Sequence, residues 1–383
     1  MASLDQSAHL PFNLQRELDQ SIPLGQKLRL VHETIKRCSG AIHRIAVALY
    51  DARTDTLSTF IHSTAGQSPL RNYSVRLSEV GSLNELASKG APRIINDLAA
   101  LAGGQGEHTK KLLGDGYRSS LTYPFYHNGR IQGFLFFNSR MKGAFGGNLL
   151  DLLNVFSQVI SSLVVKETAF VRTVTAAIHT AQNITRHKDE ETGAHLERMA
   201  QYSRLITASL AEGHGFDDEY IEYMQLFAPM HDIGKVAIPD AILLKPDRLT
   251  IEEFAAIRTH TTVGREIIDN MVSEFAIDGF PHIQVLSNIV ELHHEAMDGS
   301  GYPRGLRDAD IPIEARICAV ADIFDALTSA RPYKPAWDNA TAFSMLEHMS
   351  GTKLDRDCVE ALVRSHKKVN EIQAIFGESG LGS

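Results

Sequence analysis

The sequence predicts a multidomain protein with an α+β domain, a connecting helix and an all-α C-terminal domain. Its 383 residues suffice for two or three domains of about 100–200 residues each. Up to residue 147, β-branched runs alternate with turn signals; beyond it, apolar side chains recur at helical spacing and no further strand is convincing. Hydrophobic residues make up 43% of the chain and charged residues 22%, as in an average globular protein, which excludes wholesale disorder.

The first half begins with a lead-in and continues with an α+β pattern. Residues 1–24 are polar and contain two prolines, so we expect only a short lead-in there. Apolar residues at helical spacing predict a helix over 26–38. The runs 41–50 and 57–62 are rich in β-branched residues and flank a turn, so they predict a strand and a returning strand.

A hairpin signal predicts a second pair of strands. Residues 119–126 and 131–138 are apolar runs, and Asn128-Gly129 lies between them. Asn-Gly is typical of the two-residue hairpin turn because both positions of that turn require φ > 0. We therefore expect residues 25–147 to form one α+β domain around an antiparallel sheet.

Residues 148–180 are predicted to form the connecting helix. Apolar residues in it are spaced by three and four positions, as in a coiled-coil seam: Leu149, Leu152, Phe156, Val159 and Leu163. The seam covers only about two heptads. It is compatible with a helix that joins two copies of the chain and with an amphipathic helix that packs on its own domain. Of these two interpretations, we favour the homodimer.

Charge, cysteines and apolar runs limit the partners. The formal net charge of -8 makes a nucleic-acid polymer an unfavourable partner. The three cysteines show no CxxC spacing, which favours a reducing compartment and argues against a cysteine zinc site. The N-terminus lacks the pattern of a signal peptide, and no apolar run reaches the roughly 18 residues needed to cross a bilayer. We expect a cytoplasmic protein without membrane contact.

Histidines and carboxylates of the second half predict a metal centre. Eleven of the 17 histidines follow residue 150, and several adjoin acids or each other. Imidazole and carboxylate without thiolate suit Fe, Mn, Zn or Ni, and eight candidate ligands are too many for one ion. We predict two or three divalent ions with bridging carboxylates, an arrangement suited to in-line displacement at phosphorus. The candidates are Glu191, His195, His231, Asp232, His260, His293, His294 and Asp322.

Residues 181–368 resemble an HD-GYP domain, a branch of the HD phosphohydrolase superfamily, and leave 369–383 as a tail. Domains of this family hydrolyse cyclic di-GMP to pGpG and often continue to GMP. The segments that carry the resemblance are DEETGAHLERM (189–199), HDIGKVAIPD (231–240), HHEAMDGSGYPRGL (293–306) and IPIEARICAVADIFDALTSARPYK (311–334).

The resemblance implies how the metals are held. The eight candidate ligands fall on the metal positions of the family, with Asp232 as the bridging carboxylate and Glu191 associated with a third ion. Lys235 matches the lysine beside the metals. Asp325 lies one turn beyond Asp322, and we expect it to be a supporting partner of Lys235.

The resemblance also implies a substrate pocket. Tyr302, between Gly301 and Pro303, lies in the loop that shapes the nucleotide site. Its ring could stack on a base, donate a hydrogen bond, or merely pack the loop onto the domain. Arg331 and Lys334 match residues that hold the substrate phosphates, in line with the preference of guanidinium and ammonium groups for phosphate.

These residues together predict a reaction. Metal ions lower the pKa of bound water and neutralise phosphate oxygens. We expect a metal-bridging hydroxide to attack phosphorus, while Lys235 stabilises the developing charge or protonates the leaving 3′ oxygen. Fe or Mn is the favoured metal, and Ni or Zn is also compatible. The alternatives are a 3′,3′-cyclic GMP-AMP phosphodiesterase and a non-hydrolysing cyclic-dinucleotide receptor or interaction protein.

The first half resembles a GAF sensory domain. The resemblance rests on RSSLTYPFYHNGRIQGFLFFNS (118–139) and on the order of helix and strands. It implies that this domain regulates the second half through the connecting helix. We find no cofactor signature, so a sensor of an unknown small ligand and a dimerisation platform are both open.

Overall fold

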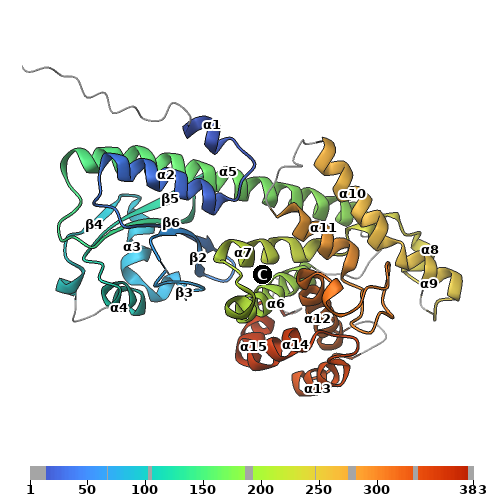
Figure 1. Ribbon diagram of the computed structural model, residues 1–383. Helices are drawn as coiled ribbons and strands as arrows, with labels where there is room; N and C mark the ends of the chain where they lie inside the picture. Colours follow the sequence, from blue (N-terminus) through green and yellow to red (C-terminus); the bar gives the residue numbers. More distant parts are fainter. Residues whose placement is uncertain are drawn as a thin grey trace, which may run out of the picture. The chain divides into compact units, whose positions relative to one another are not determined.

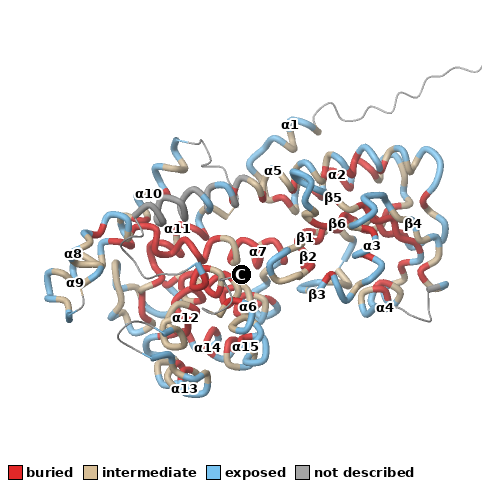
Figure 2. Tube along the Cα trace, turned by 180° about the vertical axis from the view of Figure 1, so that it is seen from behind, coloured by how far each residue is buried: buried red, intermediate tan, exposed pale blue. Residues whose placement is uncertain are grey.

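The computed structural model describes residues 14–66, 68–101, 106–185, 193–245, 247–274, 282–330 and 335–377. The chain divides into two compact units (Figures 1 and 2). The first unit comprises Met1–Ala169 with Asp217–Glu219, and the second comprises Phe170–Phe216 with Tyr220–Ser383.

The first unit is built on a six-stranded antiparallel sheet with the strand order β3-β2-β1-β6-β5-β4 (Figure 1). Asn128 and Gly129 join β5 to β6 with φ angles of 49° and 75°, as the hairpin turn requires. The predicted hairpin and the predicted pair of N-terminal strands are therefore confirmed. The strands are β1 (Arg44–Asp51), β2 (Thr56–Thr64), β3 (Ser74–Arg76), β4 (Arg93–Ile95), β5 (Ser119–His127) and β6 (Arg130–Ser139).

Helices pack on both faces of this sheet. Successive strand residues point to opposite faces, so Val47 and Ala48 of β1 enter different apolar clusters. Val47 packs in the cluster that includes residues of α2 (Leu24–Cys38) and α5 (Gly147–Thr185), whereas Ala48 packs with residues of α3 (Gly81–Lys89). The α+β class predicted for the first half is therefore confirmed. Shorter elements are α1 (Leu14–Leu18), α4 (Glu107–Gly114), η1 (Leu77–Glu79) and η2 (Leu98–Leu101).

The predicted apolar seam lies on α5 and contributes to the core of the first unit. Leu149, Leu152, Phe156 and Leu163 all pack in the cluster formed with α2 and the sheet. The homodimer therefore stays a prediction, because packing inside the unit already accounts for these seam residues. The part Gly147–Ala169 is also long and apolar enough to span a membrane by length and composition, with a mean hydropathy of 1.5, a property that core helices share.

The second unit is helical, as predicted, and in its described part only the bridge pair Ser350 and Leu354 is of β type. Its core is made by the apolar faces of α6, α7, α11, α12, α13 and α14, with Tyr202, Phe227, Ile289 and Phe324 among the buried residues. The elements are α6 (Gly193–His214), α7 (Asp218–Phe227), η3 (Ala228–Met230), η4 (Ile233–Ala237), α8 (Asp240–Leu243), α9 (Ile251–Arg258), α10 (His260–Glu274), α11 (Ile283–Leu292), η5 (Asp308–Asp310), α12 (Ile313–Thr328), α13 (Asn339–Met349), α14 (Arg356–Arg364) and α15 (His366–Ile375).

Candidate metal centre

Asp232 lies in the buried turn between η3 and η4 and contacts side chains on two sides. Its Oδ1 lies 3.2 Å from Nε2 of His260 and 3.8 Å from Nε2 of His293. Its Oδ2 lies 3.1 Å from Nε2 of His231 and 2.8 Å from Nζ of Lys235. One carboxylate thus presents a different oxygen to each of two sets of ligands, which is the geometry that a bridging ligand needs.

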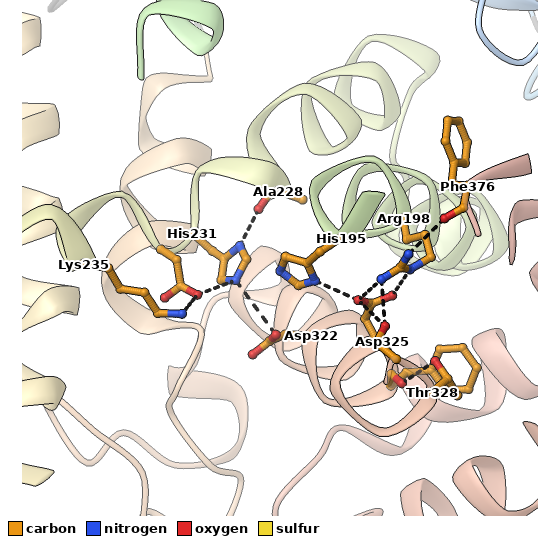
Figure 3. A network of polar contacts seen from close by, with 12 residues as sticks. His195, Arg198, Ala228, His231, Lys235, Asp322, Asp325, Thr328 and Phe376 are labelled. Carbon is orange, nitrogen blue, oxygen red and sulfur yellow. Dashed lines mark hydrogen bonds and ion pairs between the residues drawn. The ribbon is translucent and has the colours of Figure 1, made fainter. Parts of the chain in front are cut away.

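Seven of the eight predicted ligands come together in the second unit, and Glu191 lies outside the described residues. They form two groups, in each of which the candidate ligand atoms lie within 4.8 Å of one another. In Figure 3, the rings of His195 and His231 and the carboxylate of Asp322 are drawn together. The first group is Asp232, His260, His293 and His294, and the second is His195, His231 and Asp322.

Backbone carbonyls orient three of the histidines. A carbonyl oxygen can only accept a hydrogen bond, so Nδ1 must carry the proton and Nε2 of the neutral ring must be bare. In this tautomer Nε2 is the nitrogen able to bind a metal. The Nδ1 atoms of His231, His260 and His293 lie 2.9, 2.7 and 2.9 Å from the carbonyl oxygens of Ala228, Ile257 and Ile289, respectively.

His195 on α6 is oriented by a carboxylate instead. Its Nδ1 lies 2.7 Å from Oδ2 of Asp325, a residue of α12 (Figure 3). Asp325 is held in turn by Arg198, whose Nε and Nη2 donate to the two carboxylate oxygens at 2.6 and 2.9 Å. We expected Asp325 to support Lys235. That expectation was wrong, because the carboxylate contacts His195, Arg198 and Ser329.

The site favours neutral histidines and an ionised aspartate. Burial lowers the pKa values of His260 and His293, and it lowers the pKa of His294 to about 4. Burial opposes ionisation of Asp232, but Lys235 and the histidines outweigh it and hold the pKa of that carboxyl well below its usual range. At neutral pH these three imidazoles therefore keep the lone pairs that metal binding requires.

The chemistry of this donor set fits divalent cations. Nε2 of His260 lies 3.5 Å from Nε2 of His293, and both nitrogens are bare because their Nδ1 atoms donate to carbonyls. Nε2 of His195 is buried and has no hydrogen-bond partner among the described residues. Facing lone pairs repel, and an unpaired buried nitrogen costs about 1–3 kcal/mol. A cation in the first ligand group would relieve the repulsion between His260 and His293, and a cation in the second would give Nε2 of His195 a partner.

Gly234 explains why the turn after His231-Asp232 lies so close to α10. A Cβ atom at this position would lie 1.9 Å from the carbonyl oxygen of His260. Only glycine permits that approach, which brings Asp232 beside His260. Any larger residue would push η4 away from α10 and separate ligands of the first group.

The loop that carries Tyr302 is fixed directly to the histidine pair. The ring of Tyr302 is tilted against that of His294, with 4.7 Å between centroids. A Cβ at Gly301 would lie 2.3 Å from the backbone nitrogen of Ala296, so this loop also depends on glycine. Buried Glu295 accepts three backbone N–H groups, at 2.7, 3.1 and 2.9 Å, from Arg304, Gly305 and Leu306, respectively.

Arg331 and Lys334, the predicted phosphate contacts, lie outside the described residues. Conversely, sequence reasoning missed Arg198 and Glu295, which hold other residues of the site in place. The position of each residue in the sequence, close to a predicted ligand, could have indicated its role. Arg198 lies one helical turn after His195, and Glu295 directly follows the His293-His294 pair.

Comparison with known proteins finds a family match in the second unit. Residues 180–358 match the family model described as HD domain. The match includes all seven described ligands of the two groups.

Several curated relatives are similar to this part of the chain. The matched part spans about half the length of the first two relatives named below. The cyclic di-GMP phosphodiesterase response regulator RpfG of Xanthomonas campestris is 43% identical over 190 residues, 50% of this chain and 47% of that protein. A cyclic di-GMP phosphodiesterase of Thermotoga maritima is 41% identical over 189 residues, 49% of this chain and 48% of that protein. The 3′3′-cGAMP-specific phosphodiesterase 2 of Vibrio cholerae is 36% identical over 197 residues, 51% of this chain and 36% of that protein.

Solved structures similar to part of the chain include the GAF domain of a phosphoenolpyruvate-protein phosphotransferase from Acinetobacter. The similarity covers 41% of this chain and 91% of that one, with 14% identity and a TM-score of 0.32.

Proposed function

We propose that the chain is a metal-dependent phosphodiesterase that hydrolyses cyclic di-GMP to pGpG, with GMP as a further product and with regulation by the first unit. The observation that carries this proposal is the arrangement of two ligand groups around the two oxygens of Asp232. The names of the relatives support a cyclic dinucleotide as the substrate.

Bound divalent ions would supply a hydroxide near neutral pH and would neutralise the phosphate oxygens. Asp232 would hold its oxygens toward both ligand groups and fix the separation of the ions. Lys235 lies beside the same carboxylate, with 23% of its side chain exposed, so its ammonium group can reach a bound phosphodiester. There it would stabilise negative charge or give a proton to the leaving oxygen.

The reaction adds one water across one P–O3′ bond. The incoming oxygen forms a new bond to phosphorus, the bond from phosphorus to the 3′ oxygen breaks, and that oxygen takes up a proton. The product of the first cleavage is a linear dinucleotide with one 5′ phosphate. A second cleavage of the same kind gives two mononucleotides.

The test is anaerobic purification followed by metal analysis and hydrolysis assays with cyclic di-GMP and 3′,3′-cyclic GMP-AMP side by side. We expect two or three Fe or Mn ions per chain and release of linear dinucleotide. Asp232→Ala should lose both bound metal and hydrolysis. Glu360→Gln is the matched control, because Glu360 is an exposed partner of Arg364 on α14.

The two substrates separate the candidate functions. If 3′,3′-cyclic GMP-AMP is turned over faster than cyclic di-GMP, it becomes the proposed substrate in place of cyclic di-GMP. A fully loaded metal site that binds a cyclic dinucleotide and cleaves neither substrate would overturn the enzymatic proposal in favour of a receptor.

A further inference from the structure

Arg258, the last residue of α9, lies next to the candidate metal centre without being one of its ligands. Its guanidinium carbon lies 4.5 Å from the centroid of the Tyr302 ring. That ring is 4.7 Å from the ring of His294 and 6.4 Å from that of His260. A single aromatic side chain therefore separates the Arg258 cation from the ligand group around Asp232.

In the part of the chain that the structure describes, no neighbouring acid pairs with Arg258. Among the residues that the structure describes, no carboxylate oxygen lies within 4.0 Å of its guanidinium nitrogens. Two nearby arginines differ: Arg265 and Arg304 both pair with Glu291. Stacking on a ring satisfies one face of a guanidinium and leaves the N–H donors at its edge available. Arg258 is half-buried, so those donors can meet a molecule that enters from solvent.

The loop that carries Tyr302, the residue that Arg258 contacts, is held firmly. Glu295 accepts three N–H groups of the segment that follows Pro303, and Gly301 packs against the backbone of Ala296. Because Tyr302 is fixed in this way, the guanidinium stacked on it is oriented before any ligand arrives. A pre-oriented cation loses less conformational entropy when it binds than a mobile surface arginine does.

We propose that Arg258 binds the phosphodiester of the cyclic dinucleotide that is not being cleaved. This inference rests on the function proposed above. A cyclic dinucleotide carries two phosphodiesters, so when one lies at the ligand groups a cation beside these groups can bind the other. The planar guanidinium can donate two parallel hydrogen bonds to phosphate oxygens, and its contact with the Tyr302 ring limits its movement.

The test compares steady-state kinetics of Arg258→Gln, Arg258→Lys and the control Arg364→Gln. Each is assayed with cyclic di-GMP and with bis(p-nitrophenyl) phosphate, which carries a single phosphodiester. We expect Arg258→Gln to raise KM for cyclic di-GMP by ~10–100-fold, the value of a lost hydrogen bond to a charged group. The increase should be at least five times larger than that for the small ester. Arg258→Lys should recover part of the loss, and metal content should stay that of the wild type.

Three outcomes would overturn the inference. An unchanged KM for cyclic di-GMP in Arg258→Gln, in an active enzyme, would remove Arg258 from the substrate site and leave the proposed function intact. Equal losses with both substrates, accompanied by loss of metal, would make Arg258 a support of the loop only. A metal-loaded wild-type protein that cleaves the small ester but neither cyclic dinucleotide would refute the proposed function and this inference together.

Discussion

The contact between Asp325 and His195 gives a prediction that can be worked out atom by atom. Replacing Asp325 by Asn keeps the size of the side chain but leaves one oxygen and one NH₂ group where two acceptors had been. If the amide oxygen faces His195, the NH₂ group faces the Nε donor of Arg198. If the NH₂ group faces His195, Nδ1 must accept, and the proton moves to Nε2, the nitrogen intended for the metal.

We expect either orientation of the new amide side chain to weaken metal binding. The expected loss of affinity is that of other residues that orient a metal-bound histidine. Loss of a group that orients a metal-bound histidine typically costs ~10–100-fold in metal affinity, or about 1.4–2.7 kcal/mol. The variant also removes the charge of Asp325 from its buried pair with Arg198, and breaking a buried pair costs about 3–5 kcal/mol. Arg198 keeps its bonds to Ser329 and to the carbonyl of Phe376, so we expect a loss of stability near the lower end of that range.

The assay is a Mn²⁺ titration of the metal-free protein, with bound metal measured by mass spectrometry and unfolding followed by circular dichroism. Asp269→Asn is the matched control, because Asp269 forms an exposed i,i+4 pair with Arg265. Arg198→Met separates the two effects, since it should cost more stability than Asp325→Asn but less metal affinity. A folded Asp325→Asn protein that binds Mn²⁺ as tightly as the wild type would refute the reasoning.

Four further predictions concern the same centre. Lys235→Met should lower kcat by ~10²–10³-fold with bound metal retained, and loss of metal in this variant would contradict a role in charge stabilisation. Chelation should lower the melting temperature, which readdition of Mn²⁺ restores; a metal concentration 100 times Kd corresponds to about 2.7 kcal/mol, and an unchanged melting temperature would show that no ion links the helices. In the metal-free protein, burial lowers the pKa of His294 from 6.5 to about 4, so the unfolded chain binds a proton that the folded one excludes. Stability should therefore fall by at most roughly 3 kcal/mol as the pH drops through this window, and His294→Gln should flatten that profile in pH-dependent denaturant titrations. Glu295→Gln should destabilise the Tyr302 loop by roughly 1.5–3 kcal/mol, seen as faster amide exchange at residues 304–306, and unchanged exchange would exclude Glu295 as its anchor.

Much of the fold was predictable because it depends on local physics. Asn128-Gly129 predicts its hairpin since both residues adopt positive φ, and the β-branched residues of the run 41–50 predict the strand over 44–51, which is buried on both faces. The seam of α5 was harder to interpret. Its spacing identifies a helix with one apolar face, but the same spacing serves a core helix and a coiled coil. Only the packed structure assigns Leu149, Leu152, Phe156 and Leu163 to the core of the first unit.

By itself, the sequence determined which side chains could bind metal, because ligand chemistry depends on residue type. It also determined that these side chains belong to one helical domain, because their motifs follow one another within the helical second half of the chain. Only the tertiary structure decided how those residues meet. The two oxygens of Asp232 face different ligand groups because η4 packs against α10 through Gly234. Asp325 turns to His195 because α12 packs against α6, and Arg258 stacks on Tyr302 across 44 positions of sequence. Spacing along one helix predicts neighbours three or four residues apart, whereas contacts between helices depend on how their side chains pack together.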